Sequence, residues 1–120
     1  MRIVVVGTGY VGLVSGACFA DFGHHVTCVD KDEAKISSLM RGGIPIFEPD
    51  LERLVQSNAR AGRLLFTTDL AGPVVDAEAI FIAVGTPSRR GDGHADLSYV
   101  YAASREIAEA ARGFVVVVTK

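Results

Sequence analysis

Short apolar runs alternate along the chain with longer segments in which apolar and polar positions are mixed. The runs cover Ile3 to Val6, His25 to Val29, Leu64 to Phe66, Ala79 to Val84 and Phe114 to Val118. Most of them are rich in β-branched or aromatic residues, and uninterrupted runs of this length are typical of strands covered on both faces. We therefore predict a strand at each run, and we expect the last run to be a central strand.

The segments between these runs have helical patterns. Residues 10–22 are almost wholly apolar or small, which predicts a helix wedged against a sheet. Residues 31–41 place apolar side chains on one side and are followed by Gly42 and Gly43, which predicts a second helix and its end. Asp50 is expected to cap a third helix that ends near Gly62, and Asp96 a helix that runs to about Ala110.

This alternation of strands and helices predicts an α/β fold with a doubly wound parallel sheet of the Rossmann type. We expect residues 1–120 to form one dinucleotide-binding domain with no internal boundary. In a doubly wound sheet, a crossover helix normally follows a central strand, and none follows Phe114 to Val118. We therefore expect the chain to be the first part of a larger protein that continues with a helix and a substrate domain.

Composition narrows the classes of partner. The chain has 120 residues, 49% of them hydrophobic, which is enough for one core, and its net charge is -2. Binding to nucleic acid or to an anionic membrane would need a basic face that this balance does not suggest. Cys18 and Cys28 lie in apolar segments and form no CxxC motif, so we expect reduced thiols, a cytoplasmic location and no metal site.

The first residues also allow a different interpretation. Met1 and Arg2 precede an apolar stretch that ends in Ser15-Gly16-Ala17-Cys18, a pattern similar to an export signal. However, glycines at positions 7, 9, 12 and 16 interrupt the stretch where a signal would need an unbroken helix former. No apolar run reaches the roughly 20 residues that span a bilayer. We therefore disfavour a signal peptide.

The glycines match a phosphate-binding motif. Gly7, Gly9 and Gly12 form GxGxxG directly after a predicted strand and at the start of a predicted helix, which is the context that the motif requires. We expect Gly7 to permit the tight turn, Gly9 to let a pyrophosphate approach the backbone, and Gly12 to allow close packing of helix and strand. The N-H groups of the helix N-terminus would face the phosphates.

An acidic residue follows at the expected distance. Asp30 ends the second predicted strand, about 20 residues downstream, where a carboxylate reaches the adenosine ribose hydroxyls. A carboxylate there repels a 2'-phosphate, which favours NAD over NADP. Lys31 and Lys35 weaken this preference, because either ammonium group can compensate the charge. Asp30 can also cap the helix that starts at Lys31, a role compatible with ribose binding.

Longer segments resemble a known family. They are MRIVVVGTGYVGLVSGACFADFGHHVTCVDKDEAKI, GGIPIFEPDLERLV, FTTD at residues 66–69 and AIFIAVGTPSRRGDGHADLSYV. Together they are similar to the N-terminal cofactor domain of the nucleotide-sugar 6-dehydrogenases over essentially the whole chain. VGTP followed by a Gly/Asp loop and ADLSYV is more specific than GxGxxG.

The resemblance implies a function and several roles. It implies oxidation of a nucleotide-sugar C6 alcohol to a carboxylate with two NAD, UDP-glucose being the favoured substrate and GDP-mannose the alternative. The backbone at Tyr10 and Val11 would meet the pyrophosphate, and Asp30 and Lys35 the ribose. The segment Val84, Gly85 and Thr86 would contact the cofactor at the carboxyl edge of the sheet. The family also implies a homodimer built through a downstream helix.

The catalytic residues are not expected in this chain. The family's cysteine nucleophile lies beyond residue 120, and neither Cys18 nor Cys28 matches it. The histidines have no acidic or cysteine partners at ligand spacing, which disfavours a metal site. A non-catalytic dinucleotide-sensing module, a function of another class, stays open as an alternative.

The sequence departs from the family pattern at two places, and it contains one loop rich in glycine and charged residues. The family usually has Tyr-Glu-Pro-Gly-Leu where this chain has Phe47-Glu48-Pro49-Asp50-Leu51, and Gly72-Pro73 interrupts what is commonly a helix. We expect a shortened or displaced helix there. Residues 88–95 are expected to form a flexible flap over the edge of the sheet, in which Arg89 and Arg90 face solvent in preference to a phosphate.

Overall fold

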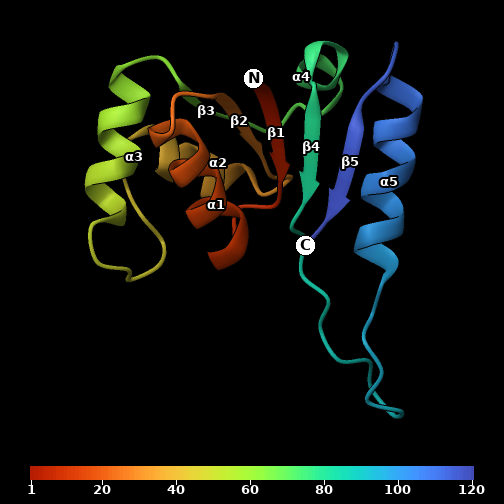
Figure 1. The fold of residues 1–120 in the computed structure, drawn as a ribbon. Helices are drawn as coiled ribbons and strands as arrows, with labels where there is room; N and C mark the ends of the chain where they lie inside the picture. Colours follow the sequence, from red (N-terminus) through yellow and green to blue (C-terminus); the bar gives the residue numbers. More distant parts are fainter.

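A computed structural model describes all residues from Met1 to Lys120. The elements in chain order are β1 (Arg2–Val6), α1 (Tyr10–Asp21), β2 (His25–Val29), α2 (Glu33–Met40), α3 (Leu51–Arg60), β3 (Leu64–Thr67), α4 (Ala71–Asp76), β4 (Ala79–Ile82), α5 (Ser98–Ala110) and β5 (Val116–Thr119) (Figure 1). Every predicted strand and helix is present, with ends that differ by a few residues.

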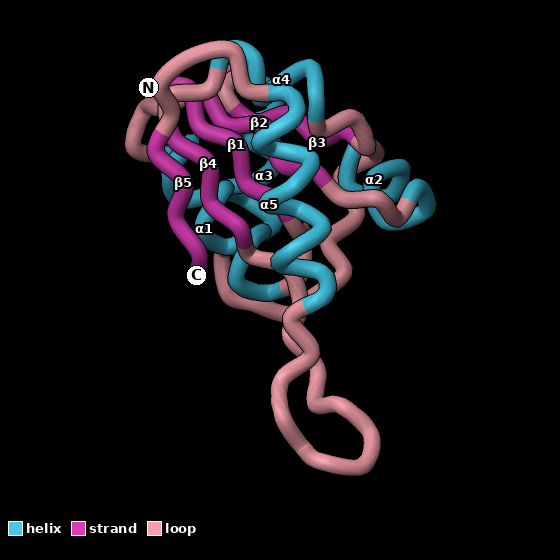
Figure 2. Tube along the Cα trace, turned by 90° about the vertical axis from the view of Figure 1, so that its right-hand side faces the viewer, coloured by secondary structure: helices cyan, strands magenta, loops and turns pink.

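The strands form one parallel sheet in the order β3-β2-β1-β4-β5. Helices α1, α2 and α3 cover one face, and α4 and α5 cover the other (Figure 2). The chain starts in the middle of the sheet and reverses its direction of growth after β3. This order predicts a ligand crevice at the carboxyl ends of β1 and β4, where the strand order changes direction. The α/β expectation is confirmed.

Strand β1 supplies both hydrophobic cores. Ile3 and Val5 point into the cluster beneath α1, α2 and α3, whereas Val4 and Val6 point into the cluster beneath α4 and α5. All of these side chains are buried. Because successive side chains of a strand point to opposite faces, the unbroken apolar run of β1 reflects burial on both sides.

Three helix starts differ from the sequence-based expectation. At α5, Leu97 and not Asp96 occupies the N-cap position, and Asp96 Oδ1 accepts a hydrogen bond from the N-H of Ser98 at 2.9 Å. Helix α2 is capped by Asp32, whose Oδ1 accepts a hydrogen bond from the N-H of Lys35 at 3.1 Å, and not by Asp30. Asp50 precedes α3 but makes no capping hydrogen bond, and its φ of 64° is left-handed. The backbone needs this conformation at the position where the family pattern has glycine, which explains that pattern. Helix α4 is short, as expected from Gly72 and Pro73.

The last strand lies at an edge of the sheet that residues 1–120 form, and its expected place inside the sheet of a longer protein stays a prediction. Strand β5 pairs with β4 alone and lies at the edge of the sheet, so it is not a central strand among these residues. Phe114, just before it, is 93% exposed, and Val116 and Val117 are also exposed. An apolar run shows that a strand suits an apolar environment, but it does not show how many neighbouring strands it has.

The helices are too short or too polar to cross a bilayer: none of them meets the length and hydropathy that a membrane span requires.

Candidate functional site

The glycine-rich turn joins β1 to α1 at the carboxyl edge of the sheet. Gly7 has a φ of 105°, and a Cβ there would lie 2.6 Å from the carbonyl oxygen of Ala83. A Cβ at Gly12 would lie 1.9 Å from the carbonyl oxygen of Gly7. A Cβ at Gly9 would meet no atom within 4 Å. Two glycines are therefore required by close packing, whereas the backbone at Gly9 is open to a ligand.

The first turn of α1 leaves backbone donors free. The earliest hydrogen bond of the helix runs from the N-H of Leu13 to the carbonyl oxygen of Gly9, at 2.9 Å. The N-H groups of Tyr10, Val11 and Gly12 precede it and have no partner within the helix. The side chains of Tyr10 and Val11 are exposed. Free N-H groups and the positive end of the helix dipole favour an anion at this point.

Asp30 lies directly beside this turn. Its Oδ2 accepts hydrogen bonds from the backbone N-H of Thr8 at 3.0 Å and from the Thr8 hydroxyl at 2.8 Å. Its Oδ1 accepts one from the N-H of Asp32 at 3.0 Å. A carboxylate offers about four acceptor positions, so Oδ1 keeps capacity for a ligand hydroxyl.

Asp30 is held in its ionised form. Partial burial raises the pKa of this carboxyl, but the hydrogen bonds from Asp32 and Thr8 and the charge of Lys35 outweigh it, so the pKa lies below the ordinary value of 3.8. The Lys35 ammonium is 3.8 Å from Oδ2. Asp30 is therefore a fixed negative charge at neutral pH, as an acceptor for ribose hydroxyls must be.

Thr8 was missed by the sequence. It occupies an unspecified position of GxGxxG, yet its side chain is fully buried and connects the glycine-rich turn to Asp30. The only signal in the sequence was a hydroxyl residue between two glycines after an apolar strand.

The segment after β4 lies beside the glycine-rich turn. The N-H of Ala83 extends the ladder to the carbonyl oxygen of Val6 at 2.8 Å, which keeps the chain beside the glycine-rich turn. Val84 is half-buried, and Gly85 and Thr86 are exposed. The structure thus brings the predicted residues of the turn, Asp30 and residues 84–86 to one edge of the sheet.

Glu48 reaches the same place from a distant loop. The hydroxyl of Tyr10 donates a hydrogen bond to Glu48 Oε2 at 2.8 Å. This contact raises the pKa of Tyr10. The loop of residues 41–50 is therefore tethered to the first turn of α1, a role for Glu48 that its position between two prolines did not indicate.

The loop after Thr86 differs from the expected flap. It extends away from the end of β4 and does not lie over the edge of the sheet (Figures 1 and 2). A bridge between Ser88 and Ala95 closes its stem, and Arg89 binds Asp92 within it at 2.7 Å. Arg89 is half exposed and its charge is used locally, in agreement with an orientation toward solvent.

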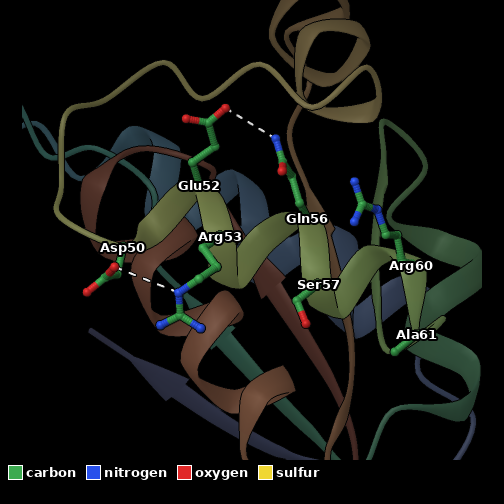
Figure 3. Close-up of a pocket in the computed structure, with 7 residues that line it drawn as sticks. All are labelled: Asp50, Glu52, Arg53, Gln56, Ser57, Arg60 and Ala61. Carbon is green, nitrogen blue, oxygen red and sulfur yellow. Dashed lines mark hydrogen bonds and ion pairs between the residues drawn. The ribbon is translucent and has the colours of Figure 1, made fainter.

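Figure 3 shows a depression on another part of the surface. It follows one exposed face of α3, with one hydrophobic residue among its lining, which consists of Asp50, Glu52, Arg53, Gln56, Ser57, Arg60 and Ala61. Within it, Asp50 pairs with Arg53 and Glu52 with Gln56. It shares no residue with the glycine-rich turn, and we assign no site to it.

The environment of Cys28 does not favour covalent chemistry. Cys28 is buried between β2 and α1, and burial raises the pKa of its thiol to about 12. The reactive form of cysteine is the thiolate, which this environment suppresses. Cys18 is also a free thiol, within α1.

The parallel sheet, the glycine-rich turn before α1 and the carboxylate at the end of β2 define a dinucleotide-binding domain of the Rossmann type. Comparison with known proteins identifies the group within this class. The chain belongs to the UDP-glucose/GDP-mannose dehydrogenase family, whose NAD binding domain matches residues 1–120. Its cofactor is accordingly NAD.

Individual relatives are similar over the whole chain. A UDP-glucose 6-dehydrogenase of Rhizobium meliloti (strain 1021) is 69% identical over 120 residues, which are 100% of this chain and 28% of that protein. One from Bacillus subtilis (strain 168) is 51% identical over 119 residues, 99% of this chain and 26% of that protein. A ternary complex of GDP-mannose dehydrogenase from Pseudomonas aeruginosa has a TM-score of 0.91 at 43% identity, covering 99% and 28% of the two chains.

The matched residues are only a part of each relative. The chain spans little more than a quarter of the relatives it matches. The similarity therefore concerns their cofactor-binding part, and what the remainder of those proteins does is not represented in these residues.

Proposed function

We propose that this chain is the NAD-binding part of an NAD-dependent UDP-glucose 6-dehydrogenase. Such an enzyme oxidises the C6 alcohol of UDP-glucose to the carboxylate of UDP-glucuronate, and two NAD accept the two hydrides. The observation that carries the proposal is the contact of Thr8 with Asp30, which places a fixed carboxylate against a phosphate-binding turn. The high identity to UDP-glucose 6-dehydrogenases supports the choice of substrate.

The residues of this chain would bind and orient the cofactor. The backbone from Gly9 to Gly12, including Tyr10 and Val11, would hold the pyrophosphate, while Gly7 keeps the turn tight. Asp30 would accept hydrogen bonds from the adenosine ribose hydroxyls, and Lys35 lies beside it. The segment from Val84 to Thr86 would line the crevice. When bound, NAD supplies the hydride acceptor for the alcohol and then for the aldehyde.

The groups that bind the sugar and carry out the chemistry are expected outside these 120 residues. We propose that the sugar-binding domain, the cysteine nucleophile and the helix that forms a homodimer follow residue 120. The 120-residue chain should therefore bind NAD and fail to oxidise a sugar. A cytoplasmic location is part of the proposal and is supported by the two free cysteines.

NAD titration tests the cofactor site. Isothermal titration calorimetry of the chain should show one NAD site, and Asp30→Ala should raise its dissociation constant. A carboxylate hydrogen bond of this kind is worth about 1.5 to 3 kcal/mol, which corresponds to an increase of roughly 10- to 150-fold. An unchanged NAD affinity in Asp30→Ala would contradict the assignment of this residue.

Steady-state NADH production by the full-length protein tests the substrate. UDP-glucose should give turnover in a panel of nucleotide sugars. GDP-mannose is the second candidate, because a GDP-mannose dehydrogenase has nearly the same fold at 43% identity. Tight NAD binding without turnover of any sugar would instead favour a dinucleotide-sensing module.

A further inference from the structure

Two lysines next to Asp30 have different partners. Lys35 lies with its Nζ 3.8 Å from Asp30 Oδ2. Lys31, the residue directly after Asp30, turns away from it and binds Glu106 of helix α5, with 2.5 Å between Nζ and Oε1. Lys31 precedes α2 in the chain, so this ion pair links the segment between β2 and α2 to helix α5, directly after the proposed ribose-binding carboxylate.

These partners bear on the choice between NAD and NADP. The two cofactors differ only at the 2' position of the adenosine ribose. NAD has a hydroxyl there, from which Asp30 would accept a hydrogen bond, and NADP has a phosphate. Binding this phosphate needs a nearby cation. Lys31 and Lys35 follow Asp30 by one and five residues in the sequence. Lys35 already neutralises Asp30 itself. Lys31 is therefore the other neighbouring cation whose charge would favour a 2'-phosphate if it were released from Glu106.

We propose that Glu106 is a specificity-determining residue that favours NAD by withholding Lys31 from the position of the 2'-phosphate. The proposal rests on the proposed NAD site and adds a second device to the repulsion by Asp30. Glu106 acts in two ways: it holds the ammonium group, and its own negative charge disfavours a dianionic phosphate nearby. NAD has no charge at that position, so its binding is independent of the pair.

The size of the effect follows from exposure. The side chains of Lys31 and Glu106 are 74% and 38% exposed. An exposed ion pair changes an equilibrium by about 1.4- to 5-fold, and the removal of a nearby like charge adds a similar factor. Glu106→Gln should therefore lower the dissociation constant of NADP by roughly 3- to 10-fold. That of NAD should change by less than about 2-fold.

The chain offers a matched control. Glu109 is exposed on the same helix α5 and makes no ion pair or side-chain hydrogen bond. Glu109→Gln removes the same charge from the same element and should leave the NADP to NAD ratio within about 2-fold of the unmodified protein, because nothing is released by it. The double variant Glu106→Gln with Lys31→Met should keep only the part of the gain that comes from removing the Glu106 charge, because the released cation is absent.

Calorimetric titration of the intact protein with NAD and with NADP, for all four forms, is the test. A gain for NADP in Glu106→Gln that falls by about half or more in the double variant is the expected result. An equal gain in Glu109→Gln, no gain in Glu106→Gln, or a gain that stays undiminished without Lys31 would each overturn the proposal while the NAD site stands. Failure of the unmodified protein to bind NAD would overturn the proposed function and this proposal with it. A thermal midpoint for each variant excludes unfolding as the cause of weak binding.

Discussion

At the scale of single residues, one buried hydroxyl connects the two halves of the cofactor site. Thr8 is completely shielded from solvent, and both its backbone and its side chain donate to the same oxygen of Asp30. The other oxygen, Oδ1, accepts one hydrogen bond from the N-H of Asp32 and keeps capacity for a ligand hydroxyl. The position of the carboxylate depends on a residue that GxGxxG leaves unspecified.

Thr8→Val should show this dependence. Valine has nearly the same shape but no hydroxyl, so Asp30 loses one charge-assisted hydrogen bond. We expect the free energy of unfolding to fall by about 1.5 to 3 kcal/mol and NAD binding to weaken, as measured by urea denaturation and calorimetry. Thr8→Ser retains the hydroxyl and should retain most of both. Equal losses in the two variants would show that packing of the methyl group matters more than the hydrogen bond.

The lowered pKa of Asp30 predicts a pH dependence. A carboxyl whose pKa is lower in the folded than in the unfolded state stabilises the fold fully above its unfolded pKa, and this contribution disappears as the pH falls through the folded pKa. The difference in unfolding free energy between the unmodified protein and Asp30→Asn should be constant above about pH 5 and shrink below about pH 4. A difference that already declines near pH 7 would contradict the hydrogen-bonded carboxylate.

At the scale of elements, the sequence predicted the regular parts well and the ends less well. The apolar runs located every strand because burial on both faces of a parallel sheet leaves a strong signal. Helix starts depend on single hydrogen bonds. Asp30, Asp32 and Asp50 are chemically alike, but the fold uses only Asp32 as a cap. In the site, the glycines and Asp30 could be predicted from spacing, whereas Thr8 and Glu48 depend on contacts that no local pattern records.

The left-handed residue before α3 gives a prediction about stability. A side chain with a Cβ is strained at the φ of 64° found at Asp50, and glycine is not. Asp50→Gly should be about 1 kcal/mol more stable than Asp50→Ala in urea denaturation, even though glycine makes the unfolded chain more flexible. The loss of the ion pair with Arg53 is common to both variants and cancels. Equal stability of the two would mean that the turn relaxes without cost.

The contact between α1 and β2 gives a second prediction about stability. A Cβ at Gly16 would lie 2.6 Å from the Sγ of buried Cys28. Gly16→Ala should therefore destabilise the fold by about 1 to 3 kcal/mol, although alanine is the better helix former. Cys28→Ala removes the obstructing sulfur, so the double variant should be more stable than the sum of the single changes predicts. Additive effects would show that the sulfur is not the obstacle. Circular dichroism during thermal unfolding measures all three.

At the scale of the whole molecule, the sheet has two edge strands. Strand β3 lies at one edge, and β5 at the other with exposed valines on its surface. An exposed apolar edge strand can pair with another copy through its free backbone groups. The isolated 120-residue chain should therefore self-associate at high concentration.

Val117→Lys should reduce this association. Val117 is exposed on β5, and a lysine at an edge strand opposes pairing because charges of two copies would meet. Sedimentation velocity at increasing concentration should show fewer dimers than in the unmodified chain. Tyr101→Lys changes the net charge equally on exposed α5 and should have little effect. An equal reduction by both would indicate general charge repulsion in place of strand pairing.

The two cores that share β1 have a consequence for folding. Since all the inner side chains of β1 are apolar, a slip by one residue would exchange its faces and still bury valine and isoleucine on both. Hydrophobicity therefore does not select the alignment of this central strand. The selection falls to its two ends: the N-H of Arg2 binds Glu78 at 2.7 Å, and Gly7 must reach the one position where its backbone fits against Ala83. The glycine that shapes the cofactor turn thus also sets the register in which the sheet assembles.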